Sequence, residues 1–194
     1  MSEKIIKLIF GKRGSGKSYL AKKEVQVCKR LLIYDTLGEY TEGVVVESLI
    51  ELKTFWTKVY AGNFRLIYRP LDPPAEFDVI CDLVWELGDM TFLVEEIDCF
   101  CSVQSLGPSF KAIIQRGRHK DVTLIGITQR PASVARLLTS QAKEICIFNT
   151  NEPRDIKYFS ELIGEAIVPK IAALGQYEYV IWRDGVDELI VVKA

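Results

Sequence analysis

Short apolar segments alternate along the chain with stretches in which apolar positions recur every three or four residues. The segment 122–128 is almost entirely apolar, which is typical of a strand that is covered on both faces. On this pattern we expect strands at 5–10, 31–34, 44–46, 64–68, 91–94, 122–128 and 144–148. We expect helices at 17–29, 48–60, 76–87, 110–118, 131–138 and 151–162.

Prolines, glycines and cap residues divide these elements. The two prolines in the segment 71–74 predict a loop there, because proline cannot continue a strand. Asn151 is the expected cap of the last helix, with Pro153 in its first turn. Asp184-Gly185 is a hairpin signal between strands at 177–182 and 188–192. Alternating strands and helices predict an α/β fold, with a largely parallel sheet flanked by helices and a C-terminal β-hairpin.

Length and composition narrow the class of protein. The 194 residues are expected to form one domain over 1–194. With 48% apolar and 26% charged residues the chain is an ordinary globular domain, which excludes a disordered tail, a collagen-like chain and a coiled coil. The net charge of −1 disfavours a protein held to DNA by a globally basic face, although it is compatible with a local basic patch.

The sequence also bears on the compartment. No apolar run approaches the roughly 20 residues that a membrane-spanning helix needs, and the charged start does not resemble a signal peptide. The five cysteines are odd in number, and most lie within apolar segments. Cys99 and Cys101 are close, but their one-residue spacing fits neither a zinc knuckle nor a redox pair. We therefore expect an intracellular protein with buried, reduced thiols and no membrane span, and a metal site is the alternative for the cysteines.

Residues 11–18 contain a motif that is typical of phosphate binding. Gly11-Lys12-Arg13-Gly14-Ser15-Gly16-Lys17-Ser18 fits G-x-x-x-x-G-K-[ST] without a mismatch, after a predicted strand and before a predicted helix. Glycines let the backbone turn its N–H groups toward phosphate oxygens, and the helix presents its positive end to the same anion. In such a loop Lys17 reaches the β- and γ-phosphates and Ser18 offers its hydroxyl to Mg²⁺. We therefore expect all eight residues to bind ATP, with Mg²⁺.

Two adjacent acids follow the predicted strand 91–94. The carboxyl end of a parallel strand is where ligands bind in such sheets, and successive side chains point to opposite sides. We expect Glu95 to hold Mg²⁺ through water and Glu96 to activate the attacking water, which would make the protein a hydrolase. The alternative is a pair of solvated charges. Asp98 lies past the strand and is expected behind the site or on the surface.

Further polar residues border the strand 122–128. Gln129 follows its end and is expected to sense the γ-phosphate, unless it is an exposed loop amide. Cationic residues precede its start, in the segment 115–120. Arg116 and Arg118 there are either part of a solvated helix end or a source of an arginine for the ATP of a neighbouring subunit. His119 is expected at the surface.

A GTPase is disfavoured although Asp35-Thr36-Leu37-Gly38 has the D-x-x-G form of a GTPase switch. A GTPase would also need a guanine-reading N-K-x-D segment further along the chain. Residues 149–152 do not supply one.

With these motifs in place, the chain resembles the HerA–FtsK superfamily of hexameric DNA-pumping ATPases, whose fold is a RecA-like (ASCE) P-loop NTPase. The resemblance is carried by the segments 11–18, 35–40, 95–96, 117–118 and 128–131. It implies that Lys17 and Ser18 bind nucleotide and metal, that Glu95 supports the metal, and that Glu96 is the catalytic base. It also implies that Gln129 is the sensor, and that Arg118, with Arg116 as the substitute, is the trans-acting arginine. Many FtsK-like members have aspartate where this chain has Glu95.

We expect none of the additional domains of cellular HerA and FtsK, and a motor of this size resembles most the genome-packaging ATPases of icosahedral viruses with an internal membrane. That likeness implies a ring, expected to be a hexamer, that moves double-stranded DNA without sequence preference into a preformed capsid. It implies a capsid or membrane-vertex partner, and work in the host cytoplasm with association with the virion. Lys111 and the segment 102–109 are candidates for DNA contact.

Three other functions stay open at this point. A cellular HerA-like translocase or helicase in repair or conjugation would share the chemistry and serve another process. A small-molecule P-loop kinase would work as a monomer and need no arginine from a neighbour. A non-catalytic subunit of an assembly would bind nucleotide without turnover.

Overall fold

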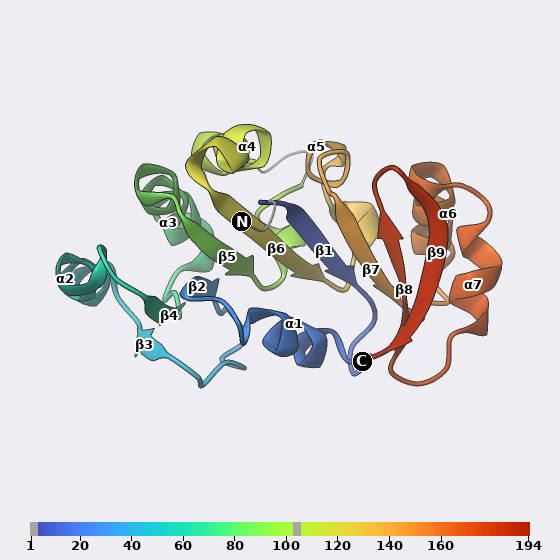
Figure 1. Ribbon diagram of the computed structural model, residues 1–194, viewed down its shortest axis with the longest axis horizontal. Helices are drawn as coiled ribbons and strands as arrows, with labels where there is room; N and C mark the ends of the chain where they lie inside the picture. The colour runs from blue at the N-terminus through green and yellow to red at the C-terminus, as the bar shows by residue number, and fades with distance from the viewer. Residues whose placement is uncertain (1–3, 103–105) are drawn as a thin grey trace.

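The computed structural model describes residues 4–102 and 106–194, and a sheet of nine strands runs through this part of the chain (Figure 1). The strand order is β3-β4-β2-β5-β6-β1-β7-β8-β9. Strands β1 to β7 pair in parallel, whereas β8 pairs antiparallel with β7 and β9. The strands are β1 (Ile6–Phe10), β2 (Arg30–Tyr34), β3 (Val44–Val46), β4 (Phe64–Tyr68), β5 (Met90–Val94), β6 (Val122–Thr128), β7 (Glu144–Phe148), β8 (Glu178–Arg183) and β9 (Val186–Lys193). The predicted α/β fold, its mostly parallel sheet and its C-terminal hairpin are confirmed.

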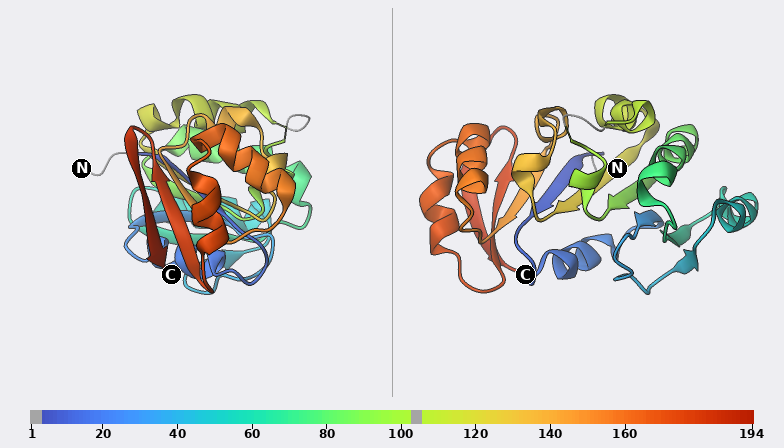
Figure 2. Two further views of the ribbon diagram at one scale, coloured as in Figure 1. Left: turned by 90° about the vertical axis from the view of Figure 1, so that its right-hand side faces the viewer. Right: turned by 180° about the vertical axis from the view of Figure 1, so that it is seen from behind.

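Helices cover both faces of this sheet, but the number of helices differs between the two faces. The buried apolar side chains form two cores, a smaller and a larger one. Of the described helices, only α1 contributes to the smaller core, in which it packs against side chains of the strands. The larger core contains side chains of the strands and of the other helices (Figures 1 and 2). Figure 2 shows α6 and α7 beside the hairpin β8–β9 at one edge. The helices are α1 (Lys17–Val25), α2 (Leu49–Val59), α3 (Pro73–Leu87), α4 (Pro108–Arg116), α5 (Arg136–Thr139), α6 (Pro153–Ile163) and α7 (Ile167–Ala173). Within the described ranges, none of the helices has the length and apolarity to span a bilayer.

Helix boundaries differ from the sequence expectations more than strand boundaries do. Helix α3 begins at Pro73, where a loop was expected, because the Asp72 side chain caps it by accepting from the Ala75 N–H and proline is tolerated in a first turn. The cap position of α6 is Glu152, one residue after the expected Asn151.

Two further segments depart from the expected helices. The segment 131–138 is a 3₁₀ turn at Pro131–Ser133 followed by the short α5, not a continuous helix. Helix α7 was not expected at all. Its Pro169 is accommodated because it lies in the first turn, where backbone N–H groups have no partner within the helix.

Parallel pairing brings the ends of several strands to one edge of the sheet. Strand β1 lies between β6 and β7, and β5 lies between β2 and β6. The loops that follow β1, β2, β5, β6 and β7 therefore meet at the carboxyl edge, which is where ligands bind in open α/β sheets.

Candidate active site

The loop from β1 to α1 turns tightly at the carboxyl edge. A Cβ on Gly11 would lie 2.6 Å from the Cβ of Phe148 and 2.7 Å from Ser15 Oγ, so only glycine fits there. Gly16 caps α1 with φ +107°, a left-handed conformation that favours glycine. The loop thus brings the first turn of α1, with its free N–H groups, against the end of β1.

Two polar groups of this loop fit an anion. The Lys17 side chain is 8% exposed, and its ammonium donates to the Lys12 carbonyl oxygen at 2.9 Å. Burial lowers the pKa of Lys17, and the surrounding carboxylates oppose that shift. The Ser15 hydroxyl is buried and has no hydrogen-bond partner, although a buried hydroxyl without one is costly. A phosphate oxygen would give the Ser15 hydroxyl the partner that it lacks and could replace the Lys12 carbonyl oxygen as the acceptor for Lys17.

Glu95 continues directly from β5 and is 2% exposed. Its Oε1 accepts a hydrogen bond of 2.6 Å from the Tyr40 hydroxyl. Burial raises the pKa of Glu95 to about 7, because the protein interior solvates a charged carboxylate poorly. The Tyr40 hydrogen bond and the charge of Lys17 act in the opposite direction.

Glu96 leaves the strand through an unusual backbone conformation. Its φ is +49°, and a 3₁₀ turn at Ile97–Cys99 begins immediately after it. A left-handed conformation in a residue other than glycine costs on the order of 1–3 kcal/mol and is concentrated at functional sites. Glu95, before this turn, is buried, whereas Glu96 is half-buried, and both line the same cleft.

The loop after β6 is tied to the turn after β5. The Thr128 hydroxyl donates a short hydrogen bond to Asp98 Oδ1 and accepts the Arg130 N–H at 2.8 Å. Gln129 lies between these two anchored residues and is exposed. Asp98 therefore lies behind the site and joins the Glu96 turn to the Gln129 loop.

One cleft of about 450 Å³ brings these side chains together. Its walls come from the phosphate loop, the loop after β2, the acid pair and the end of β6. The lining residues are Arg13, Gly14, Lys17, Ser18, Leu37, Glu39, Glu95, Glu96, Ile127, Thr128 and Gln129. The predicted residues Lys17, Ser18, Glu95, Glu96 and Gln129 thus share one cavity.

A second pocket, of about 390 Å³, adjoins the other side of the phosphate loop. Lys12, Gly14 and Ser15 form one wall, and the ends of β7 and α7 with the following loop form the other. The lining residues of that second wall are Phe148, Asn149, Leu174, Gly175, Gln176, Tyr177 and Glu178. Sequence reasoning missed this pocket, although Asn149 is a polar residue directly after an apolar strand beside β1.

The predicted arginines lie at the opposite end of β6. Arg116 ends α4, and its guanidinium carbon is 5.0 Å from the centre of the Trp85 ring, where Lys120 also stacks at 5.3 Å. Arg118 is exposed in the 3₁₀ turn Gly117–Lys120 that precedes β6. Since β6 spans seven residues, or about 20 Å, the structure does not bring these arginines to the phosphate loop of the same chain.

The remaining expectations concern the surface. His119 is exposed, as expected. Lys111 is exposed on α4. Of the candidate DNA-contact segment 102–109, residues 103–105 lie outside the described part of the chain.

The donor chemistry of the cleft fits Mg²⁺ bound together with a nucleotide. The Ser18 hydroxyl and the Glu95 carboxylate are hard oxygen donors of the kind that Mg²⁺ uses. Within residues 4–102 and 106–194, no group of three or more histidine, cysteine or acidic side chains could hold a metal by itself. Mg²⁺ typically combines one or two carboxylates with substrate phosphates, and this cleft offers such a set.

The sheet and the loop from β1 to α1 together have the form of an α/β P-loop fold. No family model matches the chain. In sequence it is similar to the DNA packaging ATPase P9 of Enterobacteria phage PRD1, which is 21% identical over 203 residues that include 95% of this chain and 85% of P9. The resemblance predicted from the motifs is confirmed.

Solved structures agree on the fold. The genome packaging NTPase B204 from Sulfolobus turreted icosahedral virus 2, in complex with sulfate, has a TM-score of 0.82 at 21% identity and covers 99% of this chain and 97% of B204. B204 has also been solved with AMPPCP, AMP and ATP-γ-S. VirB4 of Thermoanaerobacter pseudethanolicus has a TM-score of 0.68 at 14% identity and covers 96% of this chain and 88% of that one.

Proposed function

We propose that this protein hydrolyses ATP to move double-stranded DNA into a preformed viral capsid, and that it works as a ring of identical copies, a hexamer. The observation that carries the hydrolytic part is the single cleft that Lys17, Ser18, Glu95, Glu96 and Gln129 share. The DNA-packaging part is supported by the similarity to P9 and to B204. In this proposal all of 1–194 forms one ATPase domain, which acts inside the infected cell.

The loop 11–18 would bind the phosphates of ATP. The backbone N–H groups of the first turn of α1 and the positive end of that helix attract the anion. Lys17 would exchange its bond to the Lys12 carbonyl for the β- and γ-phosphates, and the Ser15 hydroxyl would gain a partner. The neighbouring pocket at Phe148 and Asn149 adjoins the same loop and has room for the nucleoside.

The two acids would take different tasks, since Glu95 is buried and Glu96 is half-buried at the same cleft. When bound, Mg²⁺ supplies positive charge that offsets the charge of the phosphates. Ser18 and Glu95 would hold it, with Glu95 acting through water. Glu96 would orient the attacking water and accept its proton, which is general base catalysis. Gln129, exposed between the anchored Thr128 and Arg130, would contact the γ-phosphate.

The arginine that completes the site comes from another copy. Arg118 is exposed at the far end of β6 and, among the described residues, makes no side-chain hydrogen bond or ion pair. A head-to-tail ring would place it against the neighbour's phosphate loop. Arg116 is the substitute, although it would first have to leave the Trp85 ring.

The candidates for DNA contact are Lys111 and the segment 102–109, of which residues 103–105 lie outside the described part of the chain. With a net charge of −1, grip on DNA would depend on a few phosphate contacts repeated around the ring, and it would weaken as salt rises. Specificity for a capsid would come from a capsid or vertex protein that docks the ring.

The test is the rate of ATP hydrolysis with and without linear double-stranded DNA, together with the mass of the assembly. We expect an oligomer whose rate rises with DNA of any sequence. A monomer that ignores DNA would overturn the motor, and phosphate transfer to a metabolite would indicate a kinase instead.

A further inference from the structure

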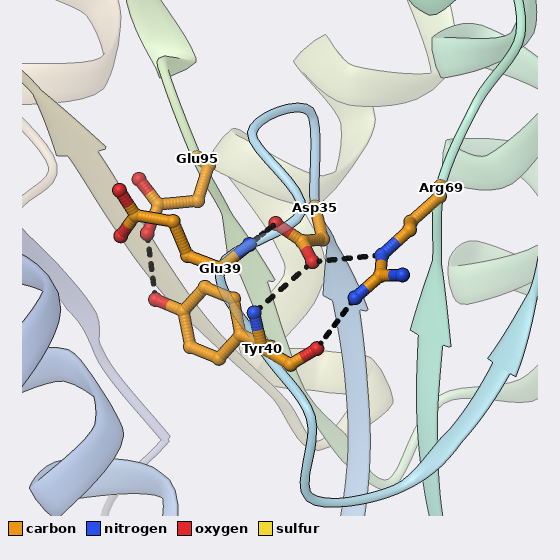
Figure 3. Close-up of polar contacts among 5 residues, drawn as sticks. All are labelled: Asp35, Glu39, Tyr40, Arg69 and Glu95. Carbon is orange, nitrogen blue, oxygen red and sulfur yellow. Dashed lines mark hydrogen bonds and ion pairs between the residues drawn. The ribbon is translucent and has the colours of Figure 1, made fainter.

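The loop that follows β2 is held by a cluster of hydrogen bonds around Asp35 (Figure 3). The Asp35 carboxylate, which is 1% exposed, accepts the Glu39 N–H at 3.0 Å and the Tyr40 N–H at 3.2 Å. Arg69, just after β4, donates through Nε to the same carboxylate at 3.3 Å. Its Nη2 donates to the Tyr40 carbonyl oxygen at 2.8 Å. The backbone of Tyr40 is therefore fixed on both sides.

The Tyr40 side chain extends from this anchored backbone to Glu95. Its ring is 3% exposed and belongs to the smaller core, and its hydroxyl donates to Glu95 Oε1 at 2.6 Å across 55 residues of sequence. Burial, and then the charge of Glu95, raise the pKa of Tyr40 above its ordinary value, so the hydroxyl keeps its proton and remains a donor. Figure 3 shows the carboxylates of Glu39 and Glu95 on the same side of the Tyr40 ring.

We propose that Tyr40 is a positioning residue for Glu95: by holding Oε1, its hydroxyl fixes the direction in which the carboxylate is offered to the cleft. The Asp35–Arg69 pair fixes Tyr40 in turn. Within residues 4–102 and 106–194, Glu95 has no ion pair, so the tyrosine hydroxyl is the side-chain contact that orients it. This assignment rests on the proposed function, in which Glu95 supports the Mg²⁺ that accompanies ATP.

The chain contains a matched control for this contact. Tyr68 is fully buried, and its hydroxyl donates to Glu76 Oε2, also at 2.6 Å, away from the cleft. Tyr40→Phe and Tyr68→Phe therefore remove the same atom and the same kind of bond to a glutamate. Only the first removes a bond to Glu95.

The experiment titrates AMPPCP binding with Mg²⁺ for the wild type and both variants, with thermal unfolding measured in parallel. Partners behind a metal ligand typically alter metal affinity by 10–100-fold, so we expect Tyr40→Phe to raise the half-saturating Mg²⁺ concentration about 10-fold. AMPPCP affinity in EDTA should stay within about twofold, since the phosphate loop is untouched. Tyr68→Phe should lower the unfolding temperature without altering the Mg²⁺ requirement.

A Tyr40→Phe protein that folds and needs no more Mg²⁺ than the wild type overturns the positioning role. Absence of Mg²⁺-dependent AMPPCP binding in the wild type overturns the proposed function itself, and the positioning role with it. Arg69→Lys provides a second test if Tyr40→Phe does not fold, because lysine keeps the charge but loses the two-point contact. It should raise the Mg²⁺ requirement about threefold, as expected for an indirect change, and an unchanged requirement contradicts the proposal.

Discussion

The two ends of strand β6 hold their charged groups in different ways. At the carboxyl end, Lys17 and Glu95 are both buried, and the electrostatic neighbours of the ammonium are acids of the same cleft. At the amino end, Arg118 is exposed and Arg116 stacks on Trp85. The carboxyl end is therefore a nearly complete pocket within one chain. The arginines at the amino end are instead at the surface, where another molecule could contact them.

This difference indicates how a nucleotide site could be divided between copies. The charges at the carboxyl end are already close to one another and need only phosphate and metal. Those at the amino end lie about 20 Å away along β6, beyond the reach of the same site. Changes at the carboxyl end should therefore act within a copy, and changes at the amino end should act on its neighbour.

The largest effect is expected at the amino end. Arg118→Ala should fold and bind AMPPCP normally but hydrolyse ATP about 10⁴-fold more slowly, because an arginine supplied in trans stabilises the charge of the transition state. Phosphate release and AMPPCP binding are the measurements. Arg116→Ala is the neighbouring control, and a larger loss there would assign the role to Arg116.

Glu96→Gln tests the carboxyl end. Hydrolysis should fall about 10³-fold while nucleotide still binds, since an amide cannot accept the proton of the attacking water. Glu86→Gln, on the exposed side of α3, is the matched control and should keep wild-type turnover. Ordinary turnover in Glu96→Gln would remove Glu96 as the base.

The buried Glu95 should make stability depend on pH. Burial raises its pKa from 4.5 to about 7, so the folded protein holds this proton more tightly than the unfolded chain. The unfolding free energy should therefore fall as pH rises from about 4.5 to about 7. At pH 8 Glu95→Gln should be more stable than wild type by about 3 kcal/mol, with no difference near pH 4.

Urea denaturation across this pH range measures that difference. Glu144→Gln is an informative comparison, because the pKa of Glu144 is shifted in the opposite direction to that of Glu95. There burial is outweighed by hydrogen bonds from Lys7 and Arg183, which lower the pKa of Glu144. Its substitution should destabilise the protein at neutral pH. Parallel pH profiles for wild type and Glu95→Gln would contradict the account of Glu95.

The smallest effect compares two threonines of β6 itself. Thr128→Val removes the hydroxyl that bonds Asp98 and the Arg130 N–H, which loosens both the Glu96 turn and the Gln129 loop. We expect hydrolysis about 10-fold slower, as for other partners that orient active-site groups. Thr123→Val, near the amino end of the strand, should hydrolyse at the wild-type rate. Equal rates in the two variants would mean that the Asp98 contact is only structural.

The sequence predicted the sheet and much of the cleft because both depend on local patterns. Buried parallel strands are continuous apolar runs, so β4, β6 and β7 were located to the residue. The phosphate loop is a contiguous motif, and Glu95, Glu96 and Gln129 follow the ends of such strands. Their convergence follows from parallel pairing alone.

What the sequence did not predict depends on contacts between distant segments. The hydroxyl of Tyr40 bonds to Glu95, which is 55 residues away in the sequence, and no local pattern predicts that bond. The second pocket combines the end of β7 with the loop after α7, a helix that was not expected because its first turn contains a proline. At Pro73 the prolines begin a helix and do not form a loop, because Asp72 caps that helix and proline is tolerated in its first turn.

The central claim is that the two ends of β6 form one site between copies, and mixing two inactive variants tests it most directly. Lys17→Ala should lose ATP binding but keep Arg118, whereas Arg118→Ala keeps an intact pocket. Each alone should be nearly inactive. An equal mixture should recover up to about a quarter of wild-type hydrolysis, since in a head-to-tail ring about that share of interfaces would join an intact pocket to an intact arginine. A mixture that co-assembles, as seen by native mass spectrometry, yet hydrolyses no faster than its parts would contradict the claim.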